Sequence, residues 1–139
     1  MLLLAGCASV QVPGYISKVD HPYDRRIYAG FEKVTSSIIY VLKSRGWNIV
    51  NEVDPSVYEI DDRYDNNGYQ NLLIITDVRK HFLTLRNTHL NVFIHSIGNT
   101  CDVEIRYEGQ NSLVKQFSSS RNDQLAQGIL NAVEEEVDR

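Results

Sequence analysis

An amphipathic stripe over residues 24–45 gives the clearest local prediction. Apolar side chains recur there every three or four positions, with polar residues between them, and this period is typical of a helix with one buried face. Asp20 or Asp24 would cap the start of that helix. Gly46 follows its last turn, at the place where a left-handed residue commonly ends a helix. The sequence therefore predicts a helix over residues 24–45.

A second stripe of the same period runs from Leu125 to Val137 near the C-terminus. Ser120 and Asp123 stand three residues apart in front of it, which is the spacing of a capping box. Three glutamates at residues 134–136 lie at the end of this helix, where the helix dipole disfavours negative charge. We expect a solvated helix end there, and a partner-binding acidic tip is the alternative.

Alternating apolar and polar residues between the two helices predict an antiparallel sheet of five or six strands. The run at residues 72–75 is apolar on both faces, so its strand is expected in the middle of the sheet. Asn67 and Gly68 predict a tight hairpin between two of the strands. The expected strands cover residues 47–53, 57–64, 69–78, 90–95, 101–107 and 113–117, with 82–85 as a short strand or irregular edge and turns at 98–99 and 109–111.

These elements predict an α+β fold built as a two-layer sandwich. The antiparallel sheet would carry the N-terminal and the C-terminal helix on one face, because each helix has one apolar side to bury. The chain has 139 residues, which suits one domain, expected over residues 21–139. Cys101 shares its apolar strand face with core positions and is expected to be buried. The predicted core includes Phe31, Val34, Ile38, Leu42, Ile74, Val92, Val103, Ile105, Leu125 and Ile129.

The first seven residues contain the most specific motif of the chain. Leu4-Ala5-Gly6-Cys7 follows further leucines and resembles the lipobox of bacterial lipoproteins. The resemblance implies that Cys7 receives a diacylglycerol thioether, that residues 1–6 are a residual signal peptide, and that the new amino terminus is acylated, typically with palmitate. Because the apolar run is short and no basic residue precedes it, we expect that the true start lies upstream or that the N-terminus was trimmed.

Residues 7–20 are predicted to form a lipidated flexible tether, since they are small and polar and include Pro13 and Gly14. Ala8 follows the cysteine, and by family analogy this implies sorting to the outer membrane with the domain facing the periplasm. The tract at residues 42–47 and the strand after it are similar to the opening of helix-on-sheet modules in lipoproteins of the outer-membrane β-barrel assembly machine. That analogy concerns the fold and implies no activity.

Composition and motifs argue against several kinds of chemistry. The net charge of −4 and the lack of any basic stretch longer than a pair disfavour nucleic-acid binding. The acidic segment at residues 61–68 fails as a calcium loop, because Arg63 would occupy its first ligand position. All four histidines are expected at the surface, since His89 and His95 would stand about 20 Å apart on one strand. We therefore predict no catalytic residue, no metal and no cofactor in a non-enzymatic protein.

Arg63, Tyr64 and Tyr69 cluster around the predicted hairpin and are our candidates for partner binding, because tyrosine and arginine are favoured at interfaces. The alternative is that tyrosine simply suits a half-exposed sheet. The predicted function is a membrane-anchored envelope lipoprotein that acts as a non-enzymatic protein-binding or assembly accessory module for an unknown envelope protein. A periplasmic inhibitor or immunity lipoprotein that blocks a hydrolase or toxin is one alternative, and a small-ligand carrier is another.

Overall fold

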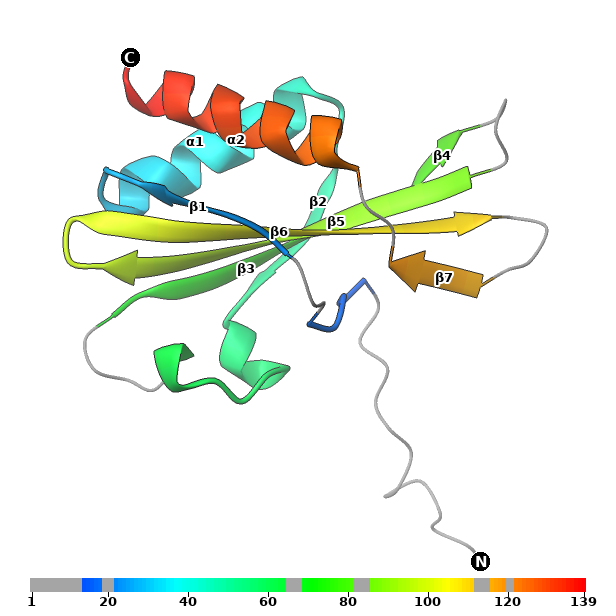
Figure 1. Cartoon of the computed structure of the whole chain (residues 1–139), viewed down its shortest axis with the longest axis horizontal. Coiled ribbons are helices and arrows are strands. Elements are labelled where there is room, and N and C mark those ends of the chain that lie inside the picture. The colour runs from blue at the N-terminus through cyan, green and yellow to red at the C-terminus, as the bar shows by residue number, and fades with distance from the viewer. Residues whose placement is uncertain (1–13, 19–21, 65–68, 82–85, 112–115, 120–121) are drawn as a thin grey trace, which may run out of the picture.

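The computed structural model describes residues 14–18, 22–64, 69–81, 86–111, 116–119 and 122–139. Two helices lie together on one face of an antiparallel sheet, and residues 14–18 lie beneath the other face (Figure 1). This confirms the α+β two-layer class, with both helices on one side of the sheet. Within the described ranges, no helix is long and apolar enough to cross a membrane.

Five strands form a continuous sheet in the order β1-β6-β5-β3-β2, and two short strands extend the far end of its central hairpin, β4 beside β5 and β7 beside β6. Every pairing is antiparallel. Gly98 has a φ of 58° in the turn between β5 and β6, which confirms the predicted turn there. The strands are β1 (Tyr23–Ile27), β2 (Ile49–Val53), β3 (Asn71–Thr76), β4 (Arg79–His81), β5 (Arg86–Ile97), β6 (Thr100–Asn111) and β7 (Gln116–Ser119).

The first helix, α1 (Phe31–Ser44), is shorter than predicted, because the residues before it form β1. Tyr23 and Ile27 are buried and the residues between them are more exposed, as in a strand that buries one face. This strand, β1, pairs with β6. The helix is preceded by Gly30 without a side-chain cap, so the predicted Asp24 cap is wrong. The left-handed Gly46 is confirmed, with a φ of 85°.

The second helix, α2 (Asp123–Val137), is capped by Asn122, whose side chain accepts a hydrogen bond from the Leu125 N–H at 3.1 Å. The predicted Ser120–Asp123 capping box is therefore wrong, and Ser120 itself lies outside the described residues. The helix end is tied to β1, since Arg25 Nη1 lies 2.8 Å from Glu134 Oε1. Glu134, the first of the three glutamates at residues 134–136, therefore helps to hold α2 against β1.

The segment predicted as a strand over residues 57–64 instead forms two short 3₁₀ turns, η2 (Pro55–Val57) and η3 (Asp62–Tyr64). Asp54 caps the first turn by accepting a hydrogen bond from the Ser56 N–H at 2.9 Å, and Pro55 suits the position after that cap. β3 pairs with β2 on one side and β5 on the other, which leaves no place for a further strand beside it. The central place of β3 is confirmed and the hairpin is wrong, although residues 67–68 lie outside the described ranges.

Three smaller expectations differ from the structure or cannot be placed. The turn predicted at residues 109–111 is wrong, because these residues belong to β6. The predicted last strand falls later than expected, on β7, and the edge at residues 82–85 lies outside the described ranges.

The hydrophobic core lies between the helices and the sheet. Phe31 and Leu125 are only partly buried and pack at its margin. Cys101 is buried, as predicted, and its burial, followed by the nearby charge of Asp102, raises the pKa of its thiol to about 11. The confirmed core positions are Val34, Ile38, Leu42, Ile74, Val92, Val103, Ile105 and Ile129.

Candidate functional site

The sheet face opposite the helices, called the second face below, collects polar and charged side chains from neighbouring strands. Residues of β6 alternate between the two faces, so the acidic and basic side chains of this strand point away from the core. The pairing register then places them beside residues of β1 and β5. Read from β1 through β6 to β5, the rows are Asp24–Glu104–Phe93 and Arg26–Asp102–His95, followed by the Arg106–Asn91 pair.

Residues 14–18, called the strap below, lie against part of the second face. Ile16 is only 1% exposed, and its N–H donates to Asn91 Oδ1 at 2.7 Å. Asn91 Nδ2 in turn donates to the Gly14 carbonyl at 2.8 Å. Gly14 has a φ of 88°, and a Cβ at this position would lie 2.6 Å from Ile75 Cγ2, so the strap requires glycine here. The flexible tether predicted over residues 7–20 includes the strap, but these contacts hold the strap against the folded domain.

Arg106 connects the strap to the sheet. Its side chain is fully buried, and Nη1 donates to the Ile16 carbonyl at 2.9 Å. The same guanidinium holds Glu59 through two bonds of 2.7 and 3.0 Å, and its Nε donates to Glu104 Oε2 at 2.6 Å. It also lies over the Phe93 ring, 4.0 Å from the centroid. One buried cation therefore joins the strap, the 3₁₀ segment and β6.

The protonation states of this cluster are fixed by its own contacts. Burial opposes the charge of Arg106, yet its hydrogen bonds to Glu59 and Glu104 raise its pKa above the ordinary value. Burial likewise opposes the charge of Glu59, but the bonds from Arg106 and Tyr15 lower the pKa of Glu59. Burial and the 2.8 Å bond to Glu59 raise the pKa of Tyr15 to about 12. At neutral pH the Glu59–Arg106 ion pair is charged and Tyr15 is a hydrogen-bond donor.

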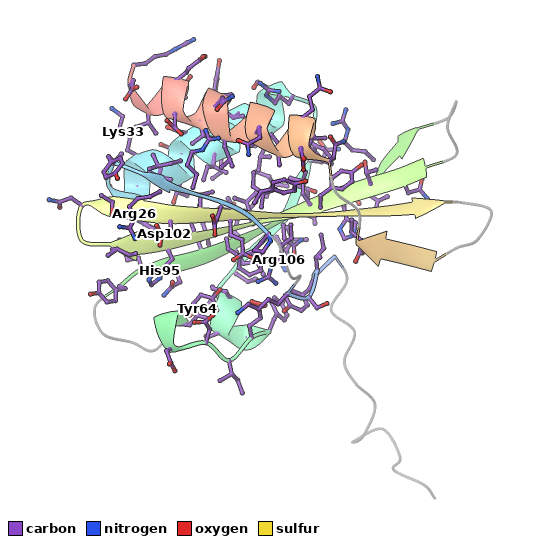
Figure 2. The ribbon with its side chains drawn as sticks, in the orientation of Figure 1. Arg26, Lys33, Tyr64, His95, Asp102 and Arg106 are labelled. Atoms are coloured by element: carbon purple, nitrogen blue, oxygen red, sulfur yellow. The ribbon has the colours of Figure 1, made fainter. Side chains whose placement is uncertain are left out.

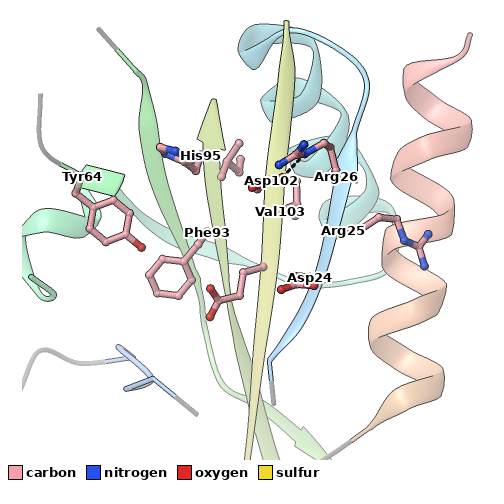
Figure 3. A pocket seen from close by; sticks show the side chains of 10 residues that line it. Asp24, Arg25, Arg26, Tyr64, Phe93, His95, Asp102 and Val103 are labelled. Carbon is pink, nitrogen blue, oxygen red and sulfur yellow. Dashed lines mark hydrogen bonds and ion pairs between the residues drawn. The ribbon is translucent and has the colours of Figure 1, made fainter. Parts of the chain in front are cut away.

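Beside the strap, the second face forms an open pocket of about 320 Å³ (Figure 3). Strands β5 and β6 provide its floor, β1 one side, and Tyr64 of η3 stands across from them. Arg25 belongs to the lining, but its side chain turns toward α2, where it bonds Asn131 at 2.7 Å. Arg26, Asp102 and His95 lie toward one end of the second face, and Arg106 lies nearer its middle (Figure 2).

Acidic groups predominate in this pocket. Asp102 Oδ1 pairs with Arg26 Nε at 3.0 Å, and Glu104 is bonded to Arg106. Asp24 is exposed, and its carboxylate has no hydrogen bond or ion pair with another described side chain. The charge of Arg106 is shared between Glu104 and Glu59, so the described side chains of the pocket are negative on balance. Among the residues that the structure describes, no group of His, Cys, Asp and Glu is arranged to hold a metal ion.

Two of the three predicted partner-binding residues, Tyr64 and Tyr69, lie at or beside this pocket. Tyr64 lines it, and the ring of Tyr69, which is 46% exposed, lies 5.7 Å from that of His95 on the pocket floor. Arg63 belongs to η3 beside Tyr64, and its side chain lies outside the described part of the structure. The structure therefore brings Tyr64 and Tyr69 to one end of the second face.

The prediction that all histidines lie at the surface is wrong for two of them. His89 and His95 are only 3% and 7% exposed. His89 Nε2 lies 2.9 Å from Glu108 Oε1, and His95 is hydrogen-bonded to Asn71. The other two histidines have no described side chain.

Sequence reasoning missed Asn91, Glu104 and Arg106. Their strands alternate clearly, and the polar side of an alternating strand normally faces water. A usable signal was the order Glu104, Arg106, Glu108 on one strand face, since an arginine between two carboxylates is suited to a buried ion pair.

No protein-family model matches this chain, and no curated protein matches its sequence. The fold and the site define the class of protein as far as a two-layer α+β domain with an acidic pocket on the sheet face opposite its helices. What such a domain does has to be inferred from the chemistry of that face.

Proposed function

We propose that this chain is an envelope lipoprotein, anchored through Cys7 in the outer membrane and facing the periplasm, that binds another envelope protein without catalysing a reaction. The observation that supports this most strongly is the strap. Gly14 follows Cys7 by only seven residues, and it is locked to the domain through Asn91 and the close approach to Ile75. An anchor at Cys7 would therefore hold the domain by the part of the domain surface to which the strap is bound.

The short distance from Cys7 to the strap limits how far the domain can reach. Seven extended residues span at most about 25 Å, since each covers about 3.3–3.6 Å. Each buried CH₂ of an acyl chain contributes about 0.8 kcal/mol, so two or more chains anchor stably. With the strap bound, Gly14 would remain within about 25 Å of the membrane. The partner would accordingly lie at the membrane surface or project from it.

The composition around the pocket supports a protein as the partner. Val57 and Ile60 are exposed on the segment that contains both 3₁₀ turns, and Tyr64 and Tyr69 lie at the same end of the second face. Exposed aliphatic and aromatic side chains near charged groups are typical of interfaces. The segment is held in place by the bidentate bond between Glu59 and Arg106. A surface that is ordered before binding loses less entropy when a partner docks.

Replacing Cys7 with serine should release the protein from the membrane. Expressed behind a lipoprotein signal sequence, the wild type should sediment with the outer membrane, and Cys7→Ser should appear in the soluble periplasmic fraction because serine cannot form the thioether. The double variant Cys7→Ser/Ser9→Cys keeps the number of cysteines but moves one out of the motif, and it should also be soluble. Membrane retention of Cys7→Ser, or a cytosolic wild type, would overturn the proposed anchoring.

A further inference from the structure

We propose that the pocket on the second face binds the cationic side chain of an arginine or lysine from the protein partner. This inference rests on the proposed function, because it names the chemistry of the partner at the same surface. The pocket itself, its charges and its aromatic side chains are observed in the structure (Figure 3).

The pairing of β1 with β6 creates a position that favours a cation. Asp24 and Glu104 stand directly opposite each other in the register, and both line the pocket. Like charges at such positions destabilise a sheet. Arg106 forms an ion pair with Glu104 but also with Glu59, and it is buried beneath the strap. A guanidinium or ammonium group between Asp24 and Glu104 would therefore relieve the repulsion that remains.

Aromatic side chains complement these carboxylates. Phe93, which is only 4% exposed, forms part of the floor, and the half-buried Tyr64 stands across the pocket (Figure 3) and offers the more accessible ring. Cations are attracted to aromatic ring faces, and the methylene stem of lysine or arginine packs against apolar surface. The chain already uses this contact internally, since Arg106 lies over one face of Phe93 and Arg79 lies over Trp47 at 4.4 Å.

The size and charge of the pocket argue against other occupants. Its volume of about 320 Å³ is at the lower end of the range of small-molecule sites, about 300–1,000 Å³, which suits a single side chain. A phosphate or carboxylate ligand would meet Arg26, which is already paired with Asp102, together with the carboxylates of Asp24 and Glu104. These repulsions disfavour an anion.

The test is a titration of the full chain, as the soluble Cys7→Ser form, with N-acetyl-arginine amide and N-acetyl-lysine amide, followed by NMR of the backbone amides. We expect saturable shifts at Phe93, Asp102 and Glu104 with a Kd on the order of 1–10 mM. N-acetyl-citrulline amide has the shape of the arginine probe without its charge, and it should give much smaller shifts. Added salt should weaken binding of the charged probes, because the site is open to solvent.

Three single variants test the inference, because they should change binding of the arginine probe in different directions. Asp24→Asn should weaken binding of the arginine probe by up to about fivefold, and Arg26→Gln should strengthen it by removing the competing cation. Glu135→Gln removes the same charge as Asp24→Asn from the exposed surface of α2, and it should leave binding unchanged. Asp24 and Arg26 do not belong to the buried Arg106 cluster, so both variants are expected to fold.

Several results would overturn the inference: shifts absent from the pocket residues, equal binding of the citrulline probe, tighter binding of N-acetyl-glutamate amide, or the same effect from Asp24→Asn and Glu135→Gln. The assay uses neither lipid nor a cellular partner. Its failure would reject the cationic occupant while leaving the anchoring result intact, and a failed anchoring test would not change the titration.

Discussion

Arg106→Leu should lower the free energy of unfolding by about 3–5 kcal/mol, because it leaves the buried Glu104 and the partly buried Glu59 without their counter-ion. Glu59 loses a bidentate bond and Glu104 loses its 2.6 Å bond. The Ile16 carbonyl also loses its donor, so the strap should open more often. Urea unfolding at pH 7 measures the first effect, and hydrogen exchange at the Ile16 amide measures the second.

A matched variant distinguishes charge compensation from simple packing. Replacing Glu59, Glu104 and Arg106 together by leucine removes every charge of the cluster, and it should recover much of the lost stability, since exchanging a whole buried ion cluster for apolar residues is often neutral. A loss below about 1 kcal/mol in Arg106→Leu would contradict the buried network.

The same cluster has a defined pH dependence. The folded pKa of Glu59 lies below its ordinary value of 4.5, so its contribution to stability is present above about pH 4.5 and is lost as the pH falls through the folded pKa. In Arg106→Leu the Glu59 carboxylate loses the cation that lowers its pKa, so it can take up a proton at a higher pH than in the wild type. The stability difference between the wild type and Arg106→Leu should therefore narrow as the pH falls toward about 4.5, and narrow further below it.

Ile105→Ala should cost about 2–5 kcal/mol, because it leaves a cavity in the centre of the core. Ile105 is fully buried on β6 and stands between Tyr23 of β1 and Val92 of β5 in the register. Val50→Ala, on the exposed edge strand β2, is the control and should change stability by less than about 0.5 kcal/mol. A loss below about 1 kcal/mol for Ile105→Ala in chemical unfolding would contradict the assigned register.

Local periodicity predicted those helices and strands that bury one face against the core. The stripe of α2 and the alternation of β5 and β6 were read correctly because each buries one face against the same core. β1 was taken for the start of α1 because its short segment fits both periods, and only pairing with β6 decides between them. The strand predicted over residues 57–64 is absent because a strand needs a partner, and local sequence does not show whether one is available.

Only part of the candidate site could be predicted from the sequence. Tyr64 and Tyr69 were found from residue type and spacing, and they do lie at the pocket end of the second face. Arg106 was not found, because its burial depends on Ile16, which is 90 positions away in the chain, and on Glu59, which is 47 positions away. The flanking Glu104 and Glu108 could have indicated an ion pair on β6, but the local sequence does not show the two distant partners.

Photo-crosslinking in intact cells tests the central claim, that the second face binds an envelope protein, most directly. A photoreactive phenylalanine would replace Tyr64 in one strain and Tyr40, which is exposed on α1 in the helix layer, in another. We predict one discrete adduct with an envelope protein from position 64, none of it from position 40, and its reduction when Cys7→Ser is added. The same adduct from both positions, or none from position 64 in a folded and membrane-bound protein, would contradict the account.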